Sequence, residues 1–274
     1  MHDFIFFGSP RFAQLTLQKL LDAGYIPRAV VCSPDRPVGR KKILTASPVK
    51  LLAQKHNIPT LQPETLHDAS FIQVYSGTSY AIVAAYAYII PHSVLRLFSH
   101  GVIGVHPSLL PLYRGASPIQ SALLDGVSTT GVSLYLMDEK MDHGPILTQK
   151  TCPVSEQDTY FSLEERLALL GGSLCVDILP QWLDKKIISQ EQDHALAIYT
   201  RKFLTEDGKV DLENDSPISI VRKIQALHPD PGVFTYINTV RTKLCEVKKI
   251  GDNWVITKII PEGKKERPAH IVLL

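Results

Sequence analysis

Residues 100–120, HGVIGVHPSLLPLYRGASPIQ, decide the fold that we predict for this chain. The stretch opens with a short apolar run at 102–105, which predicts a buried strand. His106 and Pro107 end that run and begin a loop, and a helix is expected from Ala116. A strand that leads into a histidine-bearing loop and then a helix is how α/β sheets present functional groups at the carboxyl ends of their strands. The stretch therefore predicts an α/β fold with a candidate active site after residue 105.

The sequence before this stretch predicts further parallel strands. An apolar run at 3–7, a helix ending near Asp22 and a second apolar run at 29–32 form a βαβ unit. Strands are also expected at 58–61 and 80–85, and the second of these is fully apolar, as expected of a central strand. The first turn, GSPRFA, lacks the spaced glycines of a dinucleotide-binding fingerprint. We predict an open, mostly parallel, Rossmann-like sheet without a dinucleotide site.

The sequence after this stretch predicts two domains. Residues 131–137 alternate as a strand, and leucines at helical spacing predict a helix over 158–184 with Asp158 as its N-cap. Polar, irregular sequence follows, then a short helix and several strand-like runs separated by turn residues. We expect an α/β domain at 1–184, a linker at 185–205 and a small β domain at 206–274.

Composition narrows the class of protein. The 274 residues are 45% apolar and 20% charged, with a net charge of +2, which is ordinary for a globular protein and excludes neither nucleic acid nor a small substrate. Residues 241–274 contain eight lysines and arginines but only four acidic residues, so this region is locally basic. No apolar run approaches the ~20 residues of a membrane span, and the N-terminus has no secretion signal. We expect a cytoplasmic monomer without membrane contact. The cysteines, Cys32, Cys152, Cys175 and Cys245, lack metal-ligand spacing and are expected to be reduced thiols, with no bound metal.

Two features admit more than one interpretation from the residues alone. The loop at 33–42, SPDRPVGRKK, is either a solvated surface loop or a functional one, because it is long for a βα connection. His106 and Asp142 each follow a predicted strand end. Either residue alone is more often structural, but together they would form a base and the carboxylate that orients it. The residues themselves leave both questions open.

The sequence resembles the methionyl-tRNA formyltransferase family over nearly its whole length. The shared motifs are FGSP at 7–10, PDRP at 34–37, SPVK at 47–50, AY at 85–86, IP at 90–91, VH at 105–106, SLLP at 108–111, RGA at 114–116, PIQ at 118–120, TGV at 130–132, MDE at 137–139 and PDPG at 229–232. The histidine and SLLP pattern also occurs in other 10-formyltetrahydrofolate enzymes, whereas PDRP, SPVK and PIQ are narrower markers of the tRNA enzyme.

This resemblance implies a reaction and the residues that perform it. The formyl group of 10-formyltetrahydrofolate would pass to the α-amine of methionine on initiator tRNA. His106 would transfer protons and polarise the oxyanion, and Asp142 would orient His106. The folate would be held by Ser108, Leu109, Leu110, Pro111, Tyr86, Tyr88, Ile89 and Ile90. The tRNA would contact Arg36, Arg40, Lys41, Lys42, Lys248, Lys249, Lys264 and Lys265, the last four on a shortened, OB-like C-terminal barrel.

One position departs from the family in a way that bears on catalysis. The family has asparagine two residues before the histidine, and this chain has Gly104. Loss of one oxyanion donor typically costs about 10²–10³ in rate, although a water molecule in the vacated space would restore part of it. Gly104 therefore raises two alternatives to an efficient transferase: a 10-formyltetrahydrofolate hydrolase, or a weakly active relative that binds folate or tRNA.

Overall fold

A computed structural model describes residues 3–38, 43–66, 74–75 and 77–273. The chain divides into two compact units that interleave along the sequence. The first comprises residues up to 114 together with 131–152 and 165–198, and the second comprises 115–130, 153–164 and 199 onward.

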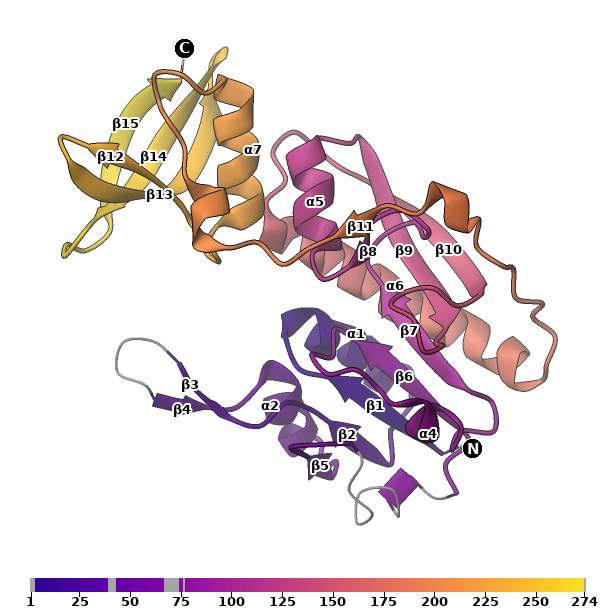
Figure 1. Cartoon of the computed structure of the whole chain (residues 1–274). Helices are drawn as coiled ribbons and strands as arrows, with labels where there is room; N and C mark the ends of the chain where they lie inside the picture. The colour runs from indigo at the N-terminus through magenta and orange to yellow at the C-terminus, as the bar shows by residue number, and fades with distance from the viewer. Residues whose placement is uncertain (1–2, 39–42, 67–73, 76, 274) are drawn as a thin grey trace. The chain divides into compact units, whose positions relative to one another are not determined.

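The first unit is built on a seven-stranded sheet in the order β10-β9-β7-β6-β1-β2-β5 (Figure 1). Its strands are β1 (Phe4–Gly8), β2 (Ala29–Val31), β5 (Thr60–Leu61), β6 (Tyr80–Ala84), β7 (Val102–His106), β9 (Thr129–Leu136) and β10 (Ile146–Pro153). The pairs β1–β2, β1–β6, β2–β5 and β6–β7 are parallel, and β7–β9 is antiparallel. The mostly parallel α/β sheet predicted from the sequence is confirmed.

Helices cover both faces of this sheet. They are α1 (Arg11–Asp22), α2 (Pro48–Lys55), α4 (His92–Leu95) and α6 (Tyr160–Leu183). The Thr16 hydroxyl of α1 donates to the Ala168 carbonyl of α6 at 3.4 Å, so these two helices lie side by side. Helices α1 and α6 cover one face of the sheet, and α4 lies on the other face (Figure 1).

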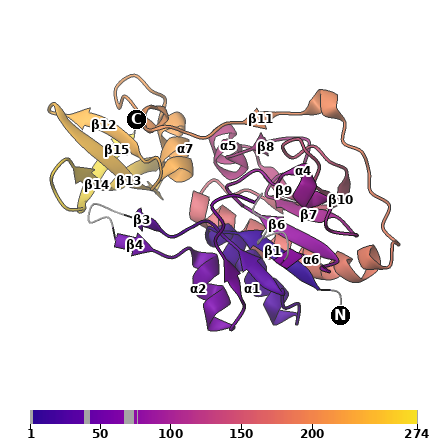
Figure 2. The same ribbon diagram turned by 60° about the horizontal axis from the view of Figure 1, so that its bottom comes forward.

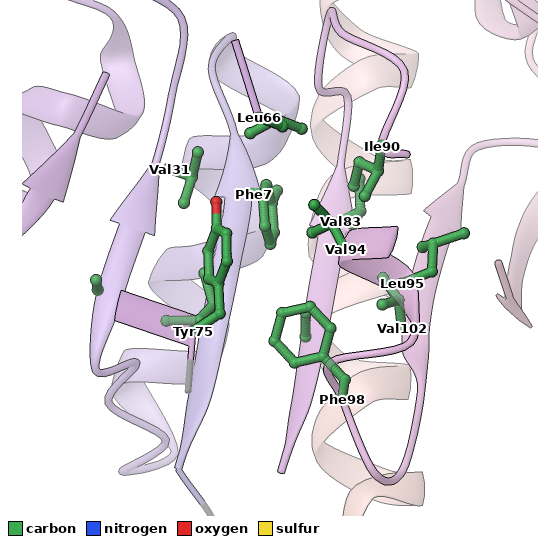
Figure 3. Packing of buried hydrophobic residues seen from close by; sticks show 13 residues of the cluster. Phe7, Val31, Leu66, Tyr75, Val83, Ile90, Val94, Leu95, Phe98 and Val102 are labelled. Carbon is green, nitrogen blue, oxygen red and sulfur yellow. The ribbon is translucent and has the colours of Figure 1, made fainter. Parts of the chain in front are cut away.

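The period of two along each strand decides which residues face α4. Ile5 and Phe7 of β1 belong to one buried cluster with Val102 of β7, Val94 of α4 and Phe98, which follows α4 (Figure 3). Alternate residues of a strand share a face, so the residues two and four positions after Val102 point to the same side as this cluster. These residues are Gly104 and His106, and the candidate site therefore lies on the α4 face of the sheet.

Several local predictions need correction. The predicted loop at 33–42 is partly a hairpin, in which β3 (Arg36–Val38) pairs with β4 (Ile43–Thr45). Strand β10 was not predicted, because its sequence, ILTQKTCP, is mostly polar and exposed, as at a sheet edge. Helix α6 begins at Tyr160. Its first turn is capped by the Thr159 hydroxyl, which accepts from the Ser162 N–H, whereas Asp158 accepts from the Ser155 N–H.

The second unit contains the predicted small β domain. Strands β12 (Val233–Ile237), β13 (Val240–Ile250), β14 (Asn253–Pro261) and β15 (Arg267–Leu273) form an antiparallel sheet in chain order (Figure 2). Helix α7 (Pro217–Leu227) packs against α5 (Pro118–Asp125), which begins two residues later than the expected Ala116. The remaining short elements are β8 (Arg114–Gly115), β11 (Tyr199–Thr200) and the 3₁₀ helices η1 (His194–Leu196) and η2 (Thr205–Gly208). None of the described helices is long and apolar enough to cross a membrane.

Candidate active site

His106 ends β7 and is almost fully buried, with 6% of its surface exposed. Its Nε2 lies 2.9 Å from the carbonyl oxygen of Tyr113. A carbonyl only accepts hydrogen bonds, so this contact assigns a proton to Nε2. The other ring nitrogen, Nδ1, faces Asp142.

Asp142 lies in the turn that follows β9, and the structure brings it to His106. Its Oδ2 is 3.6 Å from His106 Nδ1. This distance is too long for a strong hydrogen bond but short enough for a charge pair when the imidazole carries two protons. Asp142 has a φ of 50°, in the left-handed region that is uncommon for residues other than glycine. Its position therefore depends on contacts that hold the turn.

One of these contacts comes from Tyr135, which was not predicted as a site residue. Its hydroxyl donates to Asp142 Oδ1 at 2.7 Å. Burial, followed by the neighbouring charge of Asp142, raises the pKa of Tyr135 well above its ordinary value, so the phenol keeps its proton. Tyr135 is paired across the sheet with Gly104. The alternation along 131–137 could have indicated that residue 135 faces away from Leu134 and Leu136, but not what lies opposite it.

The ring of Tyr135 lies against Gly104, where a side chain at that position would be. A Cβ built on Gly104 would lie 2.3 Å from Tyr135 Cε1, far inside van der Waals contact. The aromatic ring of Tyr135 therefore occupies the space beside Gly104 in which a water molecule would have compensated for the missing side chain.

A second support for the Asp142 turn comes from Gln192, in the segment predicted to be a linker. Its side-chain amide donates to the carbonyls of Asp142 at 3.0 Å and of Gly144 at 2.7 Å. Its Oε1 accepts from Nε and Nη2 of Arg114, at 3.2 and 2.6 Å. Arg114 is only 1% exposed, so this is a buried, charge-assisted network. Sequence reasoning missed Gln192 because a single buried glutamine in a polar segment has no periodic signal.

The segment Ser108–Pro111 is held by one hydrogen bond within its loop and by others to side chains of β9 and β10. The Ser108 hydroxyl donates to the Leu112 carbonyl at 2.5 Å, and the Leu110 N–H donates to the Ser133 hydroxyl at 2.9 Å. Gln149 donates to the Leu110 carbonyl at 2.8 Å. These bonds fix the course of the loop after His106, and the Ser108 hydroxyl is used within the loop itself.

The loop that follows β6 carries the other predicted folate residues. The Tyr86 ring packs edge-on against Phe7, with ring centroids 5.5 Å apart, and also contacts Tyr88. Its hydroxyl is buried and has no hydrogen-bond partner among the described residues. Ile90 belongs to the core cluster, whereas Ile89 is 85% exposed. The four residues thus differ in what they offer a ligand.

A pocket of about 490 Å³ opens next to the Asp142 turn. It is lined by His92, Leu95, Arg96, Met137, Asp138, Glu139, Lys140 and His143. Its volume is in the usual range for small-molecule sites, and the mixed lining of charged and apolar side chains suits a ligand with both aromatic and ionic parts. None of the eight residues predicted to hold the folate lines this pocket.

The predicted tRNA residues occupy both units. Arg36 donates to the Tyr88 hydroxyl at 3.1 Å, and Arg40, Lys41 and Lys42 lie outside the described residues. Lys248 is 3.5 Å from Glu246 and Lys249 is 3.3 Å from Glu156. Lys264 and Lys265 are exposed on the turn between β14 and β15.

The cysteines lie in the interior of the protein. All four cysteines are buried and form no disulfide. Within the described part of the chain, no group of three or more His, Cys, Asp or Glu side chains is arranged to hold a metal ion.

Comparison with known proteins gives the family. Residues 3–179 match the family described as formyl transferase, and residues 202–255 match the formyl transferase C-terminal domain. The chain is 38% identical to a methionyl-tRNA formyltransferase of Halalkalibacterium halodurans over 98% of this chain and 82% of that protein. It is 41% identical to the methionyl-tRNA formyltransferase of Nitrosomonas eutropha over 90% of this chain and 78% of that protein.

A solved structure with the same fold is more distant in sequence. It is an N-formyltransferase from Helicobacter canadensis in complex with folinic acid and dTDP-3-aminofucose, 16% identical, with a TM-score of 0.64 over 99% of this chain and all of that one. The fold, the two matched domains and the relatives at 38% and 41% identity agree. The chain belongs to the methionyl-tRNA formyltransferase family, enzymes that transfer the formyl group of 10-formyltetrahydrofolate to methionyl-tRNA.

Proposed function

We propose that this chain carries out that transfer at the pair formed by His106 and Asp142. The observation that supports the proposal is their juxtaposition, 3.6 Å between Nδ1 and Oδ2, at the carboxyl end of β7. In parallel α/β sheets, ligands bind at this end of the strands. The donor and the methionyl amine would therefore meet beside His106.

The reaction needs a group that moves protons. The methionine amine attacks the formyl carbon, a C–N bond forms, and the carbonyl oxygen becomes an oxyanion in a tetrahedral intermediate. The bond from that carbon to the folate nitrogen then breaks. One proton leaves the attacking amine, and one must reach the departing folate nitrogen. His106, with its Nε2 beside the Tyr113 carbonyl and its Nδ1 facing Asp142, is the side chain that would move these protons.

The proposal also includes how the chain would bind its two substrates. The Tyr86–Ile90 loop, the Ser108–Pro111 loop and the pocket beside the Asp142 turn would hold the folate. Arg36 and the lysines at 248, 249, 264 and 265 would contact initiator tRNA through its phosphates, which gives affinity rather than sequence specificity. We also propose a monomer that acts in the cytoplasm, without membrane contact.

A two-product assay tests the function. The protein is incubated with 10-formyltetrahydrofolate, with and without charged initiator tRNA, and formyl-methionyl-tRNA and formate are measured separately. We expect formyl-methionyl-tRNA and little formate. His106→Ala should lower the transfer rate by about 10²–10⁴, the usual contribution of a proton-transfer group. His56→Ala removes an exposed histidine at the end of α2 and should leave the rate unchanged.

Two results would contradict the proposal. Formate release that does not depend on tRNA would identify a 10-formyltetrahydrofolate hydrolase, the outcome that the missing side chain at Gly104 brings into question. Binding of folate or tRNA with neither product would identify a weakly active relative.

A further inference from the structure

Tyr135 and Gly104 form a cross-strand pair next to the catalytic histidine. They are directly opposite each other on the antiparallel strands β9 and β7. Side chains of such a pair point to the same face of the sheet, and residues 104 and 106 of β7 share a face because they are two positions apart. Tyr135 therefore extends over Gly104 toward the side of the sheet that carries His106.

The position of the phenol depends on the absence of a side chain at residue 104. A Cβ on Gly104 would lie 2.3 Å from Cε1, 2.5 Å from Cζ and 2.9 Å from the hydroxyl oxygen of Tyr135. All three distances are shorter than real contacts allow, and all three atoms belong to the hydroxyl end of the ring. Any residue with a side chain at 104 would displace the hydroxyl of Tyr135 from its present place.

That hydroxyl holds one oxygen of the catalytic carboxylate. It donates to Asp142 Oδ1 at 2.7 Å, while Oδ2 of the same carboxylate faces His106 Nδ1 at 3.6 Å. A carboxylate is planar, so a bond that fixes Oδ1 also fixes the direction of Oδ2. Tyr135 is only 3% exposed, which protects this charge-assisted hydrogen bond from competition by solvent.

The Asp142 side chain needs such a restraint. Gln192 binds the main-chain carbonyls of Asp142 and Gly144 and so holds the backbone of the turn. These two bonds act on the main chain of the turn and not on the carboxylate itself. The Tyr135 hydroxyl supplies a restraint at the side chain itself.

We infer that Tyr135 is a positioning residue for formyl transfer: its hydroxyl orients Asp142 toward His106, and Gly104 is the residue that makes room for it. This inference rests on the proposed function of the His106–Asp142 pair. It also gives a physical reason for glycine at 104, because an asparagine there and the phenol of Tyr135 would compete for the same space.

A double-mutant cycle tests whether Tyr135 acts through Asp142. The full-length chain is compared with Tyr135→Phe, Asp142→Asn and the double variant, and kcat and both KM values are measured for the transfer. Tyr135→Phe keeps the ring and removes only the hydroxyl. We expect it to lower kcat on the order of 10-fold to 100-fold, the value of a hydrogen bond to a charged group, with both KM values little changed. In the Asp142→Asn background the same substitution should change kcat by less than about 3-fold, because partners in one network are not additive.

The matched control is Tyr160→Phe. The Tyr160 hydroxyl also donates to a carboxylate, that of Glu164, at 3.1 Å, but this pair is not part of the site. Its removal should leave kcat unchanged. Equal losses from Tyr135→Phe in the wild-type and Asp142→Asn backgrounds would overturn the inference, as would a Tyr135→Phe variant with wild-type kcat.

A readout that does not need activity separates this inference from the proposed function. In the ¹⁵N spectrum of histidine-labelled protein, Tyr135→Phe should move the Nδ1 resonance of His106, assigned by its loss in His106→Ala, whereas Tyr160→Phe should not. A shifted resonance in a protein that forms no formyl-methionyl-tRNA would refute the proposed function and leave the positioning contact intact. An unshifted resonance would refute the positioning role itself.

Discussion

Gly104 stands where the family resemblance leads us to expect an asparagine, and the structure shows what covers it. The resemblance implied a lost side-chain donor, for which a water molecule in the vacated space would compensate in part. Instead the ring of Tyr135 covers the glycine, and its hydroxyl is bonded to Asp142. A buried phenol that keeps its proton is a donor in the centre of the site, although it is directed at the carboxylate rather than at a substrate. The effect of a substitution at residue 104 therefore has to be measured both with and without the Tyr135 ring.

A side chain at 104 should be costly only while Tyr135 is present. We expect Gly104→Ala to lower the free energy of unfolding by about 1–3 kcal/mol, the usual cost of overpacking, because its Cβ would collide with the buried ring. In the Tyr135→Ala background most of this cost should disappear. Urea denaturation of the four proteins in this cycle measures it. An equal cost in both backgrounds would mean that the collision is not with Tyr135.

At the scale of elements, the segment 190–198 forms a strap on the first unit. Gln190 and Ile146 exchange backbone hydrogen bonds of 2.8 and 2.7 Å, and the Arg114 N–H donates to the Ile198 carbonyl at 2.8 Å. Gln192, 5% exposed, lies between these attachments and points inward. The strap therefore connects the buried Arg114 with the turn that carries Asp142.

Removing the Gln192 side chain should weaken both stability and catalysis. In Gln192→Ala, Arg114 loses two hydrogen bonds and the carbonyls of residues 142 and 144 lose their donor. We expect a loss of about 1–3 kcal/mol in the free energy of unfolding, typical of buried groups left unsatisfied, together with a lower kcat.

The neighbouring exposed residue gives the control for this prediction. Glu191→Ala removes a side chain of similar size from the same segment, but one that is exposed, and should change neither quantity. Thermal unfolding and the formylation assay measure the two effects. Equal behaviour of the two variants would show that the strap does not hold the Asp142 turn.

At the scale of the whole molecule, the proposed catalytic residues and the lysines of the small β domain belong to different units. His106, Asp142, Tyr135 and Gln192 are all in the first unit, whereas the lysines of the small β domain are in the second. Of these lysines, Lys248 and Lys249 lie beside Glu246 and Glu156, so part of their charge is locally compensated. Lys264 and Lys265, exposed on a turn, are better placed to meet phosphates.

Salt dependence of tRNA binding should reveal those contacts. The slope of log K against log salt scales with the number of phosphates that are neutralised. We expect Lys264→Ala/Lys265→Ala to make that slope shallower by about 1 per lost contact without lowering kcat at saturating tRNA. Lys185→Ala/Lys186→Ala removes the same charge from exposed positions of the first unit and should leave the slope unchanged. Identical slopes in all three proteins would exclude residues 264 and 265 from the tRNA-binding surface.

Local sequence determined the elements whose signals are themselves local. Strands β1, β6 and β7 were predicted because each is a continuous buried apolar run. The edge strand β10 was missed because exposure removes the apolar pattern on which such predictions depend.

For the site, the sequence by itself determined two candidate side chains, His106 and Asp142, through their places after strand ends and through the family resemblance. Only the tertiary structure decided what holds them. Tyr135 lies over Gly104 because of the register between two strands, and Gln192 reaches the Asp142 turn from 50 residues away in sequence. Strand register and long-range packing depend on how distant segments meet, and no periodicity within either segment encodes that meeting.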